Sequence, residues 1–199
     1  GRRFEGEDLR VLGVASSALG DVFHALRATE RAEDAYVQSL LDVVAATEHR
    51  APWFLDHSSR VRLLSRRLGE KVGLGAAELE TLDMASQLLD IGRVHLQDEV
   101  LGKSGRLSSD EWRLLRSHPE IADALIRPLG RLRHAKPVIR HHHENWDGTG
   151  YPDGLRGEDI PFLAALVRIT DAYAALTSAR PWRAALDRTA AVRRIVDYS

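Results

Sequence analysis

The chain has 199 residues, no cysteine and a formal net charge of -1 from 28 basic and 29 acidic residues. This length supports one well-buried domain with an appended helix or fragment, and the lack of cysteine excludes disulfides, thiolate catalysis and zinc–cysteine sites. The balanced charge gives no global attraction to nucleic acid, and no segment indicates a membrane span or a signal peptide, so we expect a cytoplasmic protein.

Apolar residues repeat with helical spacing along most of the chain, which predicts an all-α fold. The predicted helices cover, in chain order, residues 7–30, 35–47, 57–71, 76–92, 108–116, 120–127, 137–143, 162–176 and 188–196. Ser108, followed three residues later by Glu111, is a capping box that marks one helix start. The long irregular segment 145–161 is rich in glycine, and a loop of that length in a compact domain is usually functional or disordered.

Both ends of the sequence suggest a piece cut from a longer chain. Residues 4–31 form an amphipathic helix without a partner hairpin nearby, and the chain stops at Ser199 inside a helical pattern. Such a leading helix either pairs with its twin in a homodimer or packs on its own domain, and the periodicity favours neither. We therefore divide the chain into a helical extension, residues 1–49, and a domain, residues 50–199.

The most informative stretch is residues 141–152, which read His-His-His-Glu-Asn-Trp-Asp-Gly-Thr-Gly-Tyr-Pro. Neutral imidazoles and carboxylates are ligands of zinc, iron and manganese. The glycines that follow allow the backbone to bend sharply or to approach a bound molecule closely. The stretch therefore predicts a metal site beside a notch for a phosphate group. A histidine tag is rejected, because the run is internal.

Further ligand-type residues lie at or near the ends of apolar helical stretches: His57, Asp90, His118 and Asp171. Asp90 and Asp171 are the sharper candidates, because burial of a carboxylate is costly unless a cation or several donors meet it. Each residue alone has an ordinary explanation as a helix cap, a helix start or a salt-bridge partner. Their joint presence in one helical chain favours a shared metal site.

Taken in order, these motifs resemble the HD-GYP family, helical metal-dependent phosphodiesterases that open cyclic di-GMP. The motifs are His57-Ser58-Ser59-Arg60-Val61, Leu89-Asp90-Ile91-Gly92-Arg93, His118-Pro119, His142-His143-Glu144 with Asp147-Gly148-Thr149-Gly150-Tyr151-Pro152, and Asp171 with residues 175–183. The resemblance covers roughly residues 50–197 and implies an HD-domain bundle of about seven helices. Residues 4–31 resemble, more weakly, the closing helix of a GAF sensor domain, through Phe4, Glu7-Asp8-Leu9 and Leu12.

The resemblance implies a centre of two metal ions (iron, manganese or zinc) that share Asp90 as a bridging carboxylate. The other ligands would be His118, His142 and His143 for one ion, and His57, Asp171 and the residue at position 89 for the second. Such a pair of ions activates a water and clamps the attacking and leaving oxygens at phosphorus. The resemblance thus gives Asp90 and Arg93 catalytic roles.

Three further residues match family positions that hold the nucleotide and its phosphates: Tyr151, Arg180 and Arg183. Arginine suits this role because its guanidinium makes bidentate hydrogen bonds to phosphate. The implied partners are cyclic di-GMP or a related nucleotide, and other signalling proteins such as diguanylate cyclase domains. Neither nucleic acid nor a membrane is expected as a partner.

Four positions depart from the family pattern. Leu89 stands where the family has the His before the bridging Asp, and leucine has no lone pair. Loss of that ligand should weaken the metal affinity of one site by orders of magnitude, since mutation of residues that only hydrogen-bond to ligands already costs about 10–100-fold. Arg93 replaces a Lys, with which it is not interchangeable, and Ala174 replaces a further Asp. Trp53 stands where members with a third ion have a Glu, so we expect no third ion.

Three hypotheses remain open. The first is a weakened phosphodiesterase that hydrolyses cyclic di-GMP slowly to the linear dinucleotide or to GMP. The second is a non-catalytic module that binds metal, a nucleotide or a protein partner, which Leu89 and Ala174 favour. The third is a purely structural helical dimer. Rescue of the missing ligand by His95 or His141 is a further alternative, disfavoured because His95 lies beyond a glycine and His141 reads as a surface residue.

Overall fold

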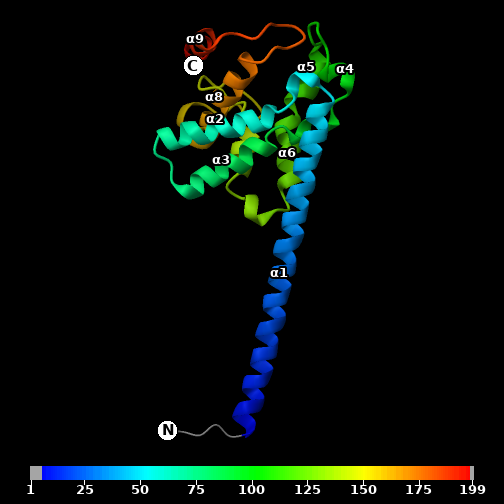
Figure 1. Cartoon of the computed structure of the whole chain (residues 1–199), viewed down its shortest axis with the longest axis vertical. Helices are drawn as coiled ribbons and strands as arrows, with labels where there is room; N and C mark the ends of the chain where they lie inside the picture. The colour runs from blue at the N-terminus through cyan, green and yellow to red at the C-terminus, as the bar shows by residue number, and fades with distance from the viewer. Residues whose placement is uncertain (1–5, 198–199) are drawn as a thin grey trace. The chain divides into compact units, whose positions relative to one another are not determined.

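The computed structural model describes residues 6–197. The regular structure of this range consists of helices, without strands, which confirms the all-α prediction (Figure 1). The α-helices are α1 (Gly6–His49), α2 (His57–Lys71), α3 (Ala76–Leu88), α4 (Asp98–Leu101), α5 (Ser109–Arg116), α6 (His118–Ile126), α7 (Lys136–His141), α8 (Phe162–Leu176) and α9 (Arg188–Asp197). The short 3-10 helices are η1 (Pro52–Phe54), η2 (Ile91–His95), η3 (Gly130–Leu132) and η4 (Gly157–Asp159).

The chain divides into two compact units, Gly1–Ser39 and Leu40–Ser199. The described part of the first unit is helical, and its apolar side chains are largely exposed, as in Leu19 at 70% and Leu26 at 58%. Two helices were predicted here, but α1 is one continuous helix, because residues 31–34 contain neither glycine nor proline to interrupt it. Phe4 and Ser199 lie outside the described residues. Among the helices of the described range, none is long and apolar enough to span a membrane.

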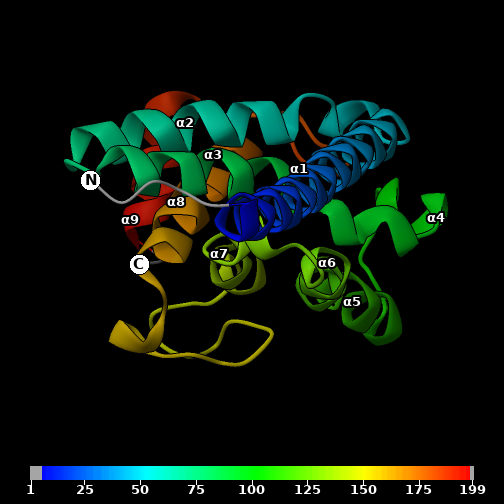
Figure 2. The same cartoon turned by 90° about the horizontal axis from the view of Figure 1, so that it is seen from below.

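The second unit is a helical bundle that holds all the predicted ligands. Helix α2 packs on α3 and α8, and these three lie side by side in Figure 2, while α6 packs on η2 and α7. Its core is made of fully buried apolar side chains: Val61, Leu82, Leu88, Ile126, Ile139 and Val167. From α2 to α9 the described residues form eight helices, close to the seven expected, because the single turn α4 was not predicted.

Close packing between η2 and α6 sets the backbone around Asp90. Helix α3 ends at Leu88 rather than at the predicted residue 92, and Asp90 precedes η2. A Cβ atom on Gly92 would lie 2.0 Å from the backbone oxygen of His118, so only glycine allows this approach. The packing brings Asp90 and His118 together. Helix α6 begins at His118, two residues before the predicted start.

Candidate metal centre

Three histidines place their potential ligand nitrogens close together. His118, His142 and His143 each offer a ligand atom, all within 4.8 Å of one another. The Nδ1 atoms of His118 and His142 lie 2.7 Å from the backbone oxygens of Leu115 and Ile139. Because a carbonyl oxygen only accepts, each Nδ1 carries the proton, and each Nε2 of a neutral ring presents a lone pair. The two Nε2 atoms face each other at 3.3 Å, an arrangement that a shared cation satisfies.

Burial keeps these rings neutral. It lowers the pKa of His142, and lowers those of His118 and His143 well below the ordinary value, with the charges of Arg93 and of the neighbouring rings acting in the same direction for the last two. The Nε2 atom of His143 is buried and has no hydrogen-bond partner among the described residues. Neutral imidazoles with an unpaired nitrogen are the form in which histidine binds metals.

Asp90 connects this group of histidines to the other predicted ligands. Its side chain is 2% exposed. One carboxylate oxygen, Oδ1, lies 3.3 Å from Nε2 of His118 and 2.5 Å from Nε of Arg93, and Oδ2 lies 3.9 Å from Nε2 of His57. Apart from the Arg93 ion pair, this buried carboxylate has no well-aligned donor among the described residues. It therefore stands in the position of a ligand that two cation sites can share.

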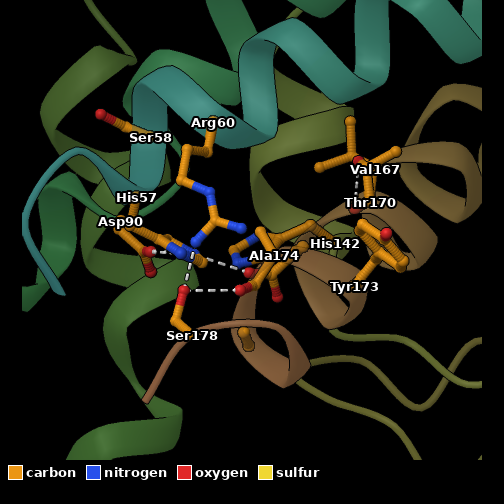
Figure 3. A network of polar contacts seen from close by, with 12 residues as sticks. His57, Ser58, Arg60, Asp90, His142, Val167, Thr170, Tyr173, Ala174 and Ser178 are labelled. Carbon is orange, nitrogen blue, oxygen red and sulfur yellow. Dashed lines mark hydrogen bonds and ion pairs between the residues drawn. The ribbon is translucent and has the colours of Figure 1, made fainter. Parts of the chain in front are cut away.

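His57 and Asp171 form a second pair beside Asp90. Nε2 of His57 donates to Oδ1 of Asp171 at 2.8 Å. Burial alone raises the pKa of Asp171, but the hydrogen bond and charge of His57 outweigh it and lower that pKa below the ordinary range. Arg60 of α2 donates to Ser178 (Figure 3) and, at 3.0 Å, to Thr177. Both residues lie just beyond α8. These bonds hold together the two helices that carry His57 and Asp171.

The glycine-rich loop is anchored by Glu144, a role that the sequence analysis missed. The buried carboxylate of Glu144 accepts from the backbone N–H groups of residues 153, 154 and 155, at 2.8, 3.1 and 3.1 Å. Asp147 likewise accepts within the loop, from the backbone and the hydroxyl of Thr149. Neither carboxylate of the 141–152 run thus faces the histidines. The anchored loop places Tyr151, whose ring stacks on His143 with centroids 4.8 Å apart.

A cavity of about 740 Å³ lies over these residues. It is lined by His57, His118, His143 and Asp171, by the basic side chains Arg93, Lys103, Arg106, Arg180 and Arg183, and by the aromatic side chains Trp53, Trp112, Tyr151 and Trp182, among others. Lys103, Arg106 and Trp112 were not predicted, because they come from the irregular segment before α5 and from α5 itself, which carry no family motif. Five basic groups and one carboxylate suit a phosphate-bearing ligand.

The two predicted nucleotide-binding arginines differ in their contacts. Arg183 donates to the backbone oxygens of Ala175 at 2.9 Å and Leu176 at 3.0 Å, so its guanidinium binds the carboxyl end of α8. The side chain of Arg180 makes no hydrogen bond or ion pair within residues 6–197; it lies over the rings of Trp53 and Phe54. Arg180 is therefore the one of the two whose donors are free for a ligand.

The HD domain family model matches residues 43–199. The chain belongs to the HD domain family, and within it to the HD-GYP proteins. It is 32% identical to the 3'3'-cGAMP-specific phosphodiesterase 2 of Vibrio cholerae, over 88% of this chain and 34% of the relative. It is 34% identical to the cyclic di-GMP phosphodiesterase response regulator RpfG of Xanthomonas campestris, over 84% of this chain and 45% of the relative.

A solved HD-GYP structure has the same fold. Bd1817, an HDG"Y"P protein from Bdellovibrio bacteriovorus, superposes with a TM-score of 0.60 at 24% identity, over 71% of this chain and 45% of that chain. The HD-GYP chain thus spans between a third and a half of the length of these relatives.

Leu89, the residue before Asp90, was expected to leave one metal site short of a ligand. Leu89 is 1% exposed and contributes no ligand atom. His95 contacts the backbone oxygens of Gly92 and Leu114, and His141 pairs with Asp153 at 2.9 Å. Both imidazoles are engaged elsewhere, so the structure gives no support to either of them acting as a ligand in place of position 89.

Proposed function

We propose that this domain binds a cyclic dinucleotide, cyclic di-GMP in the first place, over the histidine centre and hydrolyses it as a weakened metal-dependent phosphodiesterase. The observation that carries the proposal is the convergence of unprotonated Nε2 atoms from His118, which lines the cavity, and from His142 beside the buried carboxylate of Asp90. Cationic and aromatic side chains line the same cavity, as a ligand with phosphates and bases requires. Relatives named as cyclic di-GMP and 3'3'-cGAMP phosphodiesterases support the choice of substrate class.

The donor set fits one divalent ion well and a second poorly. His118, His142, His143 and Asp90 would hold the first ion, and Asp90, His57 and Asp171 the second, without a ligand from Leu89. Bound there, iron, manganese or zinc would supply a water of lowered pKa and polarise a phosphoryl oxygen. The poor fit of the second site is the reason to expect a low rate.

The chain's own residues contribute position and charge. Arg93, paired with Asp90 and packed 4.5 Å over the ring of Phe54, holds a positive charge beside the centre, where a phosphate would lie. Tyr151 stacks on His143, and both side chains line the cavity. Arg183 fixes the end of α8, and through it the helix that carries Asp171. Together these groups would orient the phosphodiester over the histidines.

A second candidate function is a module that binds metal and nucleotide without turnover and relays a signal to a protein such as a diguanylate cyclase domain. The buried Leu89, with His95 and His141 both engaged elsewhere, favours it. This reading predicts the same ligand affinity and no hydrolysis.

The test is turnover of cyclic di-GMP by the purified domain, supplied anaerobically with iron or manganese, with the products resolved by chromatography. Hydrolysis above an Asp90→Ala control supports the phosphodiesterase. Metal and nucleotide binding without hydrolysis selects the signalling module. A protein that binds no metal refutes both, and leaves a structural helical domain.

A further inference from the structure

One wall of the cavity is formed by two tryptophans that the metal centre does not use. Trp53 and Trp182 both line the cavity and meet edge to face, with ring centroids 5.1 Å apart and planes at 70°. Trp53 also contacts Phe54 at 5.7 Å, and Phe54 stacks on His57 at 4.6 Å. The tryptophan pair is thus continuous with the metal-ligating region. Trp53 stands at the position where members of the family with a third metal ion have a glutamate ligand, so this side chain is available for another role.

Trp182 is held firmly although it is 52% exposed. It lies in a turn whose ends, Arg180 and Arg183, exchange two backbone hydrogen bonds of 2.8 and 3.0 Å. The same turn is tied to the end of α8 through the guanidinium of Arg183. A large indole fixed on such a turn, with half of its surface open, is prepared to contact a flat ligand at little cost in conformational freedom.

Arg180 adds a cation with unused donors to this wall. Its guanidinium lies 4.8 Å from the ring centroid of Trp53 and 5.4 Å from that of Phe54. Burial lowers the pKa of Arg180 to about 10, which still leaves the group charged at neutral pH. No acceptor within residues 6–197 takes a hydrogen bond from its side chain. A partly buried cation of this kind is completed by acceptors on a ligand.

We propose that Trp53, Trp182 and Arg180 form a subsite for a guanine base. The base would stack on the indole pair, and its O6 and N7 atoms would accept hydrogen bonds from Arg180. Adenine presents an N6 donor beside N7, which arginine cannot meet, so the subsite selects guanine over adenine. The inference rests on the proposed function, because the base belongs to the nucleotide whose phosphates face the histidines. Relatives carry the names of cyclic di-GMP and of 3'3'-cGAMP phosphodiesterases, so base choice differs among such proteins.

Calorimetric titration of the metal-loaded protein with cyclic di-GMP and with cyclic di-AMP tests the subsite. Trp182→Ala should weaken binding of both nucleotides by roughly 5- to 150-fold, the range for one stacked base, and Trp182→Phe should retain most of the affinity. Arg180→Ala should weaken cyclic di-GMP and leave cyclic di-AMP almost unchanged. Trp146→Ala is the matched control, because Trp146 is 64% exposed and does not line the cavity.

The outcomes separate this inference from the proposed function. If Trp182→Ala binds as tightly as wild type, or if Arg180→Ala weakens both nucleotides equally, as a phosphate contact would, the guanine subsite is wrong and the proposed function stands. If metal-loaded wild type binds neither nucleotide, both are wrong. Chromatography after each titration shows whether the nucleotide is intact; where it is hydrolysed, initial rates are measured and KM values are compared instead.

Discussion

Restoring the missing ligand by Leu89→His should create a second metal site at a cost in metal-free stability. Leu89 is 1% exposed, so the variant loses the burial of a leucine side chain and gains a buried polar ring without a partner. These two losses together cost about 3 kcal/mol, or roughly 6–12 °C in Tm for a chain of this size. If the new imidazole binds an ion together with His57, Asp90 and Asp171, metal at about 1,000 times its Kd returns about 4 kcal/mol.

The assay is thermal unfolding of wild type and variant, in chelator and in manganese, together with metal content by mass spectrometry. The expected results are a lower Tm than wild type in chelator, a larger gain than wild type on adding manganese, and an increase from about one to about two ions per chain with faster cyclic di-GMP hydrolysis. Leu89→Asn is the control, since it buries a polar side chain without an imidazole. A folded Leu89→His variant whose metal content equals that of wild type would refute the reasoning.

Three further variants test the site. His143→Ala should lower the affinity for the bound metal by at least tenfold, so that dialysed protein loses the ion. Full metal occupancy of the dialysed variant would contradict the ligand assignment. Glu144→Gln removes the charge that accepts three N–H groups, so amide exchange at residues 153–155 should accelerate while the rest of the domain stays protected; unchanged exchange argues against the anchor. Gly92→Ala should lower the free energy of unfolding in denaturant by about 3 kcal/mol or more. Gly105→Ala is the control and should not, because the space around its Cβ is open. Equal denaturation midpoints for the two variants would show that the predicted clash is relieved.

Local sequence information predicted most of the helices and the candidate ligands. Residues 57–71 and 162–176 were predicted as helices with the bounds that α2 and α8 have in the structure, because apolar periodicity and capping act over a few residues. The Ser108–Glu111 capping box is present as predicted. The ordered motifs also predicted the HD-GYP family, which the HD domain match and the phosphodiesterase relatives together confirm. None of this required knowledge of which helices pack together.

Only the tertiary structure decided how those residues meet and which of them are free. Asp171 accepts from His57 across 114 residues of chain, and the early end of α3 follows from the contact of Gly92 with α6. Arg180 and Arg183 match the same kind of motif position, yet one is free for a ligand and the other binds a helix end. The pairing of Trp53 with Trp182 likewise has no signal in the sequence. These features depend on contacts between distant segments, which local periodicity and spacing do not encode.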